Sequence, residues 1–207
     1  MRAFIALDLP LNIKNAVSEI QGKLKALLPK ISWTKPENLH ITLKFLGEIS
    51  PKQSGDIKQI ITEVTKTTSV FKIKFETLSV FPDIKRPRLI WIGTNQVPPE
   101  LKQIVEQLEL KIARTGIPKE NRQFSNHVTV GRIKNNIDPA ELEEALNKVR
   151  GDLINRNLAL HESLAGQSAT IIGGLEFDAV RITLFQSTLG AAGPTYTALN
   201  EANFRIT

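Results

Sequence analysis

Two short stretches of this chain combine a histidine with a threonine two positions later. His40 and Thr42 form one pair, and His127 and Thr129 form the other, 87 residues further along; together they use two of the chain's three histidines. Successive side chains of a β-strand point to opposite faces, so each histidine shares a face with its threonine while aliphatic neighbours point into a core. Each stretch therefore presents one imidazole and one hydroxyl to the same space.

Two imidazoles that share a groove are suited to paired proton transfer near neutral pH. One can accept a proton from water while the other donates a proton to a departing oxygen, and the hydroxyls can donate to phosphate oxygens. A strained 2′,3′-cyclic phosphate suits this arrangement, because its leaving oxygen stays close. Neither four-residue motif contains a carboxylate, so a metal site is poorly supported and we expect no metal or other cofactor.

A single histidine–threonine pair carries little information. Such pairs are common in half-buried strands, where the histidine can bond a backbone carbonyl. The argument therefore depends on finding two copies at matched positions of an internal repeat.

A cation near the phosphate is also expected. Lys44 would share the motif face in a regular first strand, so it is the preferred candidate. In a regular second strand, the alternation of side chains turns Arg132 away from His127 and Thr129, unless a bulge occurs at Gly131. Its counterpart in the first stretch, Phe45, has the pattern of a core residue.

Aromatic and basic residues elsewhere could hold the rest of a nucleotide. Trp33 is the preferred base-stacking candidate, with Phe81 a second, because Trp91 sits in an apolar strand and is expected in the core. The cations that cluster between the two halves and could contact an RNA backbone are Lys85, Arg86 and Arg88.

Strands and helices alternate along the chain in an order that occurs twice. The expected strands cover residues 4–7, 39–46, 71–80, 89–92, 127–130 and 177–185. The expected helices cover residues 10–28, 51–64, 98–114 and 139–149, with Ser50 and Asp138 as N-caps of the second and fourth. The third strand of the second half comes late, which predicts an insertion at about 151–174. We expect a surface loop or an extended helix end there, and no role for its histidine, His161.

The repeat predicts one bilobal catalytic domain, residues 1–207, with half-repeats 1–82 and 83–207. Each half is a β-α-β-α-β unit, and a pseudo-twofold axis would place His40 opposite His127. The resulting fold class is α+β.

Composition sets broad limits on function. The formal net charge of +6 favours a polyanionic partner such as RNA, and the absence of cysteine excludes disulfides, thiolate metal sites and a cysteine nucleophile. No apolar run approaches the roughly 20 residues of a membrane span, and the first residues have no signal-peptide pattern, so we expect no membrane contact and a cytoplasmic location. Phosphate-loop and dinucleotide-binding glycine motifs are absent.

An ordered set of motifs resembles the two-histidine phosphoesterases, specifically the RNA 2′,3′-cyclic phosphodiesterases first named 2′-5′ RNA ligases. The resemblance spans nearly the whole chain, and its most specific pieces are NLHITLKFLG at 38–47, PRLIWIG at 87–93 and HVTVGR at 127–132. Two departures are Asn126, where the family often has proline, and the length of the 151–174 segment.

The resemblance implies a bilobal fold in which two antiparallel sheets flank a central cleft, with helices outside. It implies metal-free hydrolysis of RNA-terminal 2′,3′-cyclic phosphates to 2′-phosphates. We expect a monomer, with RNA ends such as those of tRNA fragments as its partner. By this resemblance His40 is the proton donor to the 3′ oxygen, His127 is the acceptor that activates water, and Thr42 and Thr129 bind the phosphate.

Three alternatives stay open from the sequence. One is reversible 2′-5′ ligation at the same site, and another is an RNA- or nucleotide-binding module without turnover. The third is a small cyclic nucleotide or ADP-ribose cyclic phosphate as substrate.

Overall fold

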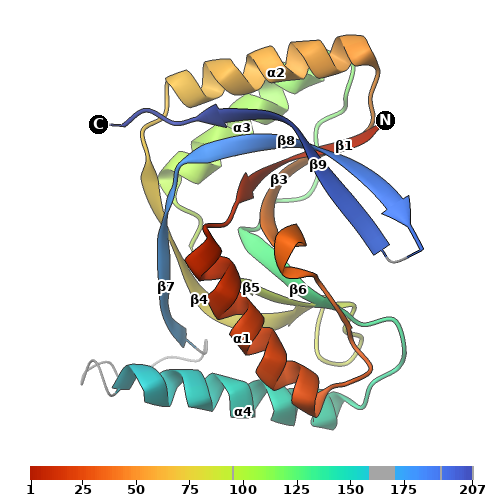
Figure 1. Ribbon diagram of the computed structural model, residues 1–207, viewed down its shortest axis with the longest axis vertical. Helices are drawn as coiled ribbons and strands as arrows, with labels where there is room; N and C mark the ends of the chain where they lie inside the picture. Colours follow the sequence, from red (N-terminus) through yellow and green to blue (C-terminus); the bar gives the residue numbers. More distant parts are fainter. Residues whose placement is uncertain (95, 159–170, 192, 207) are drawn as a thin grey trace.

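The computed structural model describes residues 1–94, 96–158, 171–191 and 193–206 (Figure 1). The strands are β1 (Arg2–Asp8), β2 (Ser32–Trp33), β3 (His40–Glu48), β4 (Phe71–Phe81), β5 (Leu89–Gly93), β6 (His127–Arg132), β7 (Ile171–Ala179), β8 (Arg181–Gly190) and β9 (Gly193–Asn203). The helices are α1 (Leu11–Leu27), α2 (Pro51–Lys66), α3 (Pro99–Ala113) and α4 (Pro139–Leu158), with a 3₁₀ turn, η1, at Pro36–Asn38.

The strands form two antiparallel sheets with matching strand orders. The four-stranded sheet has the order β3-β1-β8-β9, and the five-stranded sheet has the order β2-β6-β5-β4-β7. Without β2, the second order begins β6-β5-β4, and these three strands are the counterparts from the other half of β3, β1 and β8 in the first order. The sheets lie between two helix pairs, α2 and α3 on one side and α1 and α4 on the other (Figure 1). This architecture confirms the predicted α+β class with helices outside.

Each sheet takes strands from both halves of the sequence. The first-half strands β1 and β3 pair with the second-half strands β8 and β9, while β4 from the first half joins β5, β6 and β7. The two first-half helices are also divided between the sheets: α1 packs against the five-stranded sheet and α2 against the four-stranded sheet. The predicted half-repeats are therefore interleaved in space, and each sheet depends on both.

Helix positions follow from local sequence signals. In α1 the residues at helical spacing, Ile13, Val17, Ile20 and Leu24, are all buried. Ser50 and Gln53 form a reciprocal capping box at the start of α2, and the Asp138 carboxylate accepts a bond from the Ala140 N–H at the start of α4. No helix in the described part of the chain is long and apolar enough to cross a membrane.

The expected final strand is wrong as a single element. Residues 177–185 belong to two strands that separate at Val180: β7 lies in the five-stranded sheet and β8 in the four-stranded sheet. The sequence of this stretch shows no turn signal at Val180, so the two strands could not be told apart from the sequence. Strands β2 and β9 were also not expected.

The predicted insertion is only partly described. Helix α4 continues to Leu158, beyond the expected end near residue 149, and β7 already includes residues 171–174. An extended helix end is therefore confirmed for part of the segment. Residues 159–170, with His161, lie outside the described residues.

Both motif strands contain a β-bulge at the same place. Ile5 pairs with Lys44 and Ala6 with Thr42, which leaves Leu43 as the extra residue in β3. In β6 the pairs are Ile90 with Gly131 and Trp91 with Thr129, which leaves Val130 as the extra residue. After each bulge the alternation of side chains is reversed, so both strands show the same burial sequence from the histidine onward.

The bulge in β3 overturns the expected role of Lys44. Its side chain turns into the interior and is 3% exposed. The ammonium Nζ lies 2.7 Å from Glu109 Oε2 and 3.1 Å from the carbonyl oxygen of Pro118. Lys44 is therefore part of a buried ion pair under the four-stranded sheet and is not a cation of the motif face.

We expect Glu109→Ala to destabilise the protein strongly, because it leaves the Lys44 charge buried without its partner. The loss in the free energy of unfolding should be about 3–5 kcal/mol, measured by urea denaturation. The control is Glu63→Ala, which breaks the solvent-exposed pair with Lys111 and should leave the free energy of unfolding nearly unchanged. Equal losses in the two variants would contradict the buried pair.

Candidate active site

The two motif strands come into contact although they belong to different sheets. β3 is the outer strand of the four-stranded sheet, β6 lies between β2 and β5, and β3 packs against β6. The positive charge of Arg132, at the end of β6, acts on both His40 and Tyr196 of the four-stranded sheet. The fold therefore brings together the two histidine–threonine pairs that the repeat predicted.

Each imidazole is held by an equivalent hydrogen bond, from Nδ1 to the main-chain carbonyl two residues earlier. His40 Nδ1 lies 2.7 Å from the carbonyl oxygen of Asn38, and His127 Nδ1 lies 2.9 Å from the carbonyl oxygen of Ser125. A carbonyl oxygen only accepts, so Nδ1 carries a proton in both rings. The Nε2 atoms are therefore left for proton exchange with a ligand.

His40 sits in a largely aromatic surrounding. Its ring centroid lies 4.8 Å from that of Phe4 and 5.3 Å from that of Tyr196, whose ring is edge-on. Nε2 is 3.0 Å from Thr42 Oγ1, so the hydroxyl donates to the neutral ring.

The pKa of His40 is lowered to about 4, mainly because burial removes water from the charged form. The hydrogen bond to Asn38 and the negative charge of Asp8 oppose this shift, while Lys14 and Arg132 add to it. His40 is therefore neutral near pH 7 when no anion is bound.

His127 has a different neighbour, Trp91. The two ring centroids are 6.2 Å apart in an edge-on arrangement. Trp91 is directly opposite Thr129 in the register of β5 and β6, so it lies on the motif face. Its side chain is half-buried, and the expectation that it belongs to the core is wrong.

Trp33, and not Trp91, is the tryptophan that packs against the core. It pairs with Gly131, packs against the core, and has a buried indole N–H without a hydrogen-bond partner in the described structure. A Cβ at Gly131 would lie 3.1 Å from two atoms of this indole. Trp33 therefore covers the back of β6 and is not available to stack a base on the motif face.

Arg132 is the cation that the structure places beside the motifs. The bulge at Val130 returns it to the face of His127 and Thr129, and its side chain is exposed. A bulge is defined by pairing with a neighbouring strand, so the sequence of β6 alone could not show that Arg132 lies on the motif face. The glycine before Arg132 was the only local signal.

Asn38 is a site residue that the sequence did not single out. Its carbonyl orients His40, and its side-chain Nδ2 donates to the carbonyl oxygen of Pro194 at 2.9 Å. Pro194 is the second residue of β9, which also carries Tyr196. Asn38 is 8% exposed and thus connects the β8–β9 hairpin to the histidine. Its place two residues before the motif was a signal, but its partner is 156 residues away.

Asn126, which precedes the second motif, is buried and has no such contact. It is 1% exposed, and neither its Nδ2 nor its Oδ1 has a hydrogen-bond partner in the described structure. Its counterpart in the first half is Leu39, a core residue.

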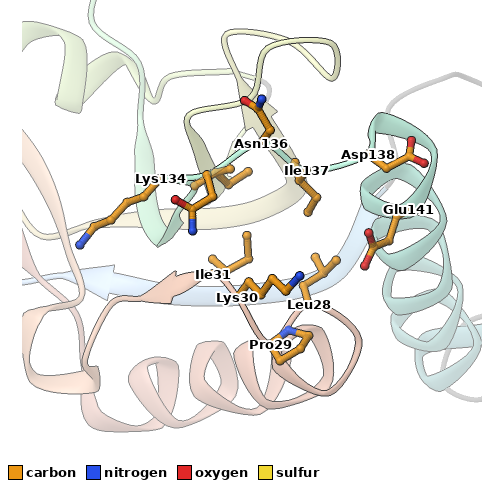
Figure 2. Close-up of a pocket in the computed structure, with 11 residues that line it drawn as sticks. Leu28, Pro29, Lys30, Ile31, Lys134, Asn136, Ile137, Asp138 and Glu141 are labelled. Carbon is orange, nitrogen blue, oxygen red and sulfur yellow. The ribbon is translucent and has the colours of Figure 1, made fainter.

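Among the described residues, no group of three or more His, Asp or Glu side chains could hold a metal ion. A pocket of about 130 Å³ lies elsewhere, between the end of α1 and the start of α4 (Figure 2). Leu28, Ile31 and Ile137 line it, and no motif residue does.

Comparison with known proteins gives the family. The family described as LigT like phosphoesterase matches the chain twice, at residues 7–91 and 92–157, once in each half of the repeat. The chain belongs to this family.

Relatives and solved structures extend this result. An RNA 2′,3′-cyclic phosphodiesterase of Aquifex aeolicus is 32% identical over 202 residues, 97% of this chain and 96% of the relative. One of Methanocaldococcus jannaschii is 30% identical over 97% of this chain and 99% of its own length. The crystal structure of TT0787 of Thermus thermophilus has a TM-score of 0.76 at 22% identity, covering 100% of this chain and 99% of that one. E. coli LigT complexed with 3′-AMP has a TM-score of 0.71 at 22% identity, covering 98% and 97%. At these identities the structures show the LigT-like fold alone.

The lowered pKa of His40 predicts a pH effect on both titration and stability. Between pH 6.5 and about 4 the unfolded chain binds a proton at His40 that the folded protein does not, so folding stability is lost as pH falls through this window. We expect the His40 ring signals in NMR to titrate near pH 4. The variant His40→Gln should reduce the pH dependence of the unfolding free energy, and a His40 midpoint near 6.5 would refute the prediction.

Asn38→Asp should disturb His40 without removing it. The variant loses the N–H that binds Pro194 and places a carboxylate near the imidazole, so the pKa of His40 should rise. We expect up to about a tenfold loss of activity, the scale of one hydrogen bond. Asn136→Asp, an exposed change of the same charge, is the control. An unchanged His40 titration in Asn38→Asp would argue against this coupling.

Proposed function

We propose that this protein hydrolyses RNA-terminal 2′,3′-cyclic phosphates to 2′-phosphates, with His127 as base and His40 as acid and without a metal ion. The observation that carries the proposal is the pair of equivalent histidine–threonine units, each with its imidazole held through Nδ1. The names of the relatives, RNA 2′,3′-cyclic phosphodiesterases, support the substrate class.

The proposed reaction needs two proton transfers at the Nε2 atoms. His127 Nε2 accepts a proton from water as the water oxygen bonds to phosphorus. His40 Nε2 donates a proton to the 3′ oxygen as the bond between that oxygen and phosphorus breaks. The products are a 3′-hydroxyl and a 2′-phosphate, and the histidines end with their protonation states exchanged.

The low pKa of His40 links protonation to substrate binding. A donor must be protonated, and a neutral His40 in the free protein would not serve. The negative charge of the bound phosphodiester favours the imidazolium form, so we propose that His40 takes up its proton together with the substrate.

The phosphate oxygens would be held by neighbouring donors. The hydroxyls of Thr42 and Thr129 share the histidine faces, and the exposed guanidinium of Arg132 lies on the same side. Hydrogen-bond donors that are fixed in advance stabilise charge that develops in the transition state. Arg132 replaces Lys44 as the proposed cation.

The test is ³¹P NMR of an oligoribonucleotide with a 2′,3′-cyclic phosphate end, mixed with the protein in EDTA. We expect conversion to the 2′-phosphate, and a loss of about 10²–10⁴-fold in rate for His40→Ala and for His127→Ala. Partial rescue of either variant by added imidazole would separate a chemical role from a folding defect.

Other outcomes would choose among the alternatives. A 3′-phosphate product would mean that the 2′ oxygen leaves. A 2′-5′ diester formed with added 5′-hydroxyl RNA would show ligation. Binding without conversion would overturn the hydrolase proposal in favour of a binding module.

A further inference from the structure

We propose that the open face of the five-stranded sheet binds the single-stranded RNA that precedes the terminal cyclic phosphate. This inference rests on the proposed function, because it takes the RNA end to lie at His127. It assigns an interaction surface beyond the reacting nucleotide, formed by β4, β5 and β6.

Two rows of side chains cross this face beside His127. In the first row Thr129, Trp91 and Ser79 are opposite one another on β6, β5 and β4. In the second row Arg132, Leu89 and Phe81 are opposite one another. None of these six side chains is fully buried.

The rows place two aromatic rings in sequence from the reacting centre. Trp91 lies against His127, and Phe81 lies one row further out, diagonal to Trp91 across β4 and β5. Phe81 is 53% exposed, although phenylalanine is usually buried. Unpaired bases stack on aromatic rings that a sheet presents in this way.

Cations gather where the rows end. Loop 82–88 joins β4 to β5 and carries the exposed side chains of Lys85, Arg86 and Arg88. The Asp83 carboxylate accepts hydrogen bonds from the main-chain N–H groups of residues 85 and 86, which shapes this loop.

The loop is also tied to the rows through its main chain. The Arg88 N–H donates to the Phe81 carbonyl at 2.7 Å, and the Arg88 carbonyl accepts from the Ile133 N–H at 2.9 Å. The cations are thus fixed next to Phe81 and Arg132, where they can bind phosphates between stacked bases.

The four-stranded sheet is the other candidate. It presents the exposed ring of Phe45 and the charge of Arg2 near Tyr196, but its hairpin adds no cations to them. Phe4, Phe185 and Tyr196 pack on one another around His40, and Phe4 is only 4% exposed. The hairpin beyond them, residues 186–197, contains no charged residue. A polyanionic strand is therefore directed along the five-stranded sheet.

The experiment compares two substrates with the same reacting end. One is a 2′,3′-cyclic mononucleotide, and the other is an eight-residue oligoribonucleotide that ends in the same cyclic nucleotide. We expect Phe81→Ser to lower kcat/KM for the oligonucleotide by about fivefold to a hundredfold, the range for loss of one stacked base. Its kcat/KM for the mononucleotide should stay within about twofold of the parent protein. The control is Leu110→Ser on α3, an equally exposed apolar side chain (54%), which should change neither value.

A charge variant tests the same surface independently. Arg86→Glu combined with Arg88→Glu should weaken binding of the oligonucleotide to the His40→Ala protein. It should also flatten the salt dependence of that binding, because fewer phosphate contacts form.

The two proposals fail in different ways. Hydrolysis of both substrates with no selective effect of Phe81→Ser would overturn the RNA track and leave the hydrolase intact. Hydrolysis of neither substrate, while the oligonucleotide binds the parent protein more tightly than Phe81→Ser, would overturn the hydrolase and retain the track. Unchanged binding of the oligonucleotide, with an unchanged salt dependence, in the charge variant would overturn the track.

Discussion

A strand normally presents alternate side chains to one face, and both motif strands of this protein break that alternation at matching positions, Leu43 and Val130. The two bulges decide which residues follow the histidine and threonine onto the open face. Lys44 and Gly131 turn inward, while Phe45 and Arg132 turn outward. A backbone with twofold character thereby carries an asymmetric site, with an aromatic ring on one side and a guanidinium on the other.

Lys44 and Gly131 occupy the same inward position after the two bulges, and the protein accommodates them in different ways. Lys44 needs Glu109 and the Pro118 carbonyl to neutralise and solvate its charge. Gly131 needs no partner, but it leaves room for Ile31 and Trp33, whose side chains would meet a Cβ at 2.9 and 3.1 Å. A side chain at Gly131 would push Trp33 away and move the end of β6, which carries Arg132.

The sequence predicted the features that local periodicity and duplication encode. The four helices and the capping residues Ser50 and Asp138 depend on short-range patterns, and the structure contains them. The contact between the two motif strands follows from the duplication. Features set by long-range pairing were missed. The bulges depend on β1 and β5, the break at Val180 depends on two different sheets, and the bond between Asn38 and Pro194 spans most of the chain. Trp33 and Trp91 were exchanged for the same reason, since only the register of β6 shows which face each one covers. The chemical roles of the histidines and threonines stay predictions.

The hydrogen bonds from Nδ1 to the carbonyls of Asn38 and Ser125 also restrict what happens between turnovers. A free imidazole can gain a proton at one nitrogen and lose one from the other, but a ring bound to the main chain through Nδ1 has only Nε2 for both steps. With the roles proposed above, each turnover leaves a proton on His127 and removes one from His40. His127 must then release its proton, and His40 must gain one with the next substrate, each through the same nitrogen that performed the chemistry. The enzyme's resting state is thus restored only as fast as the site empties.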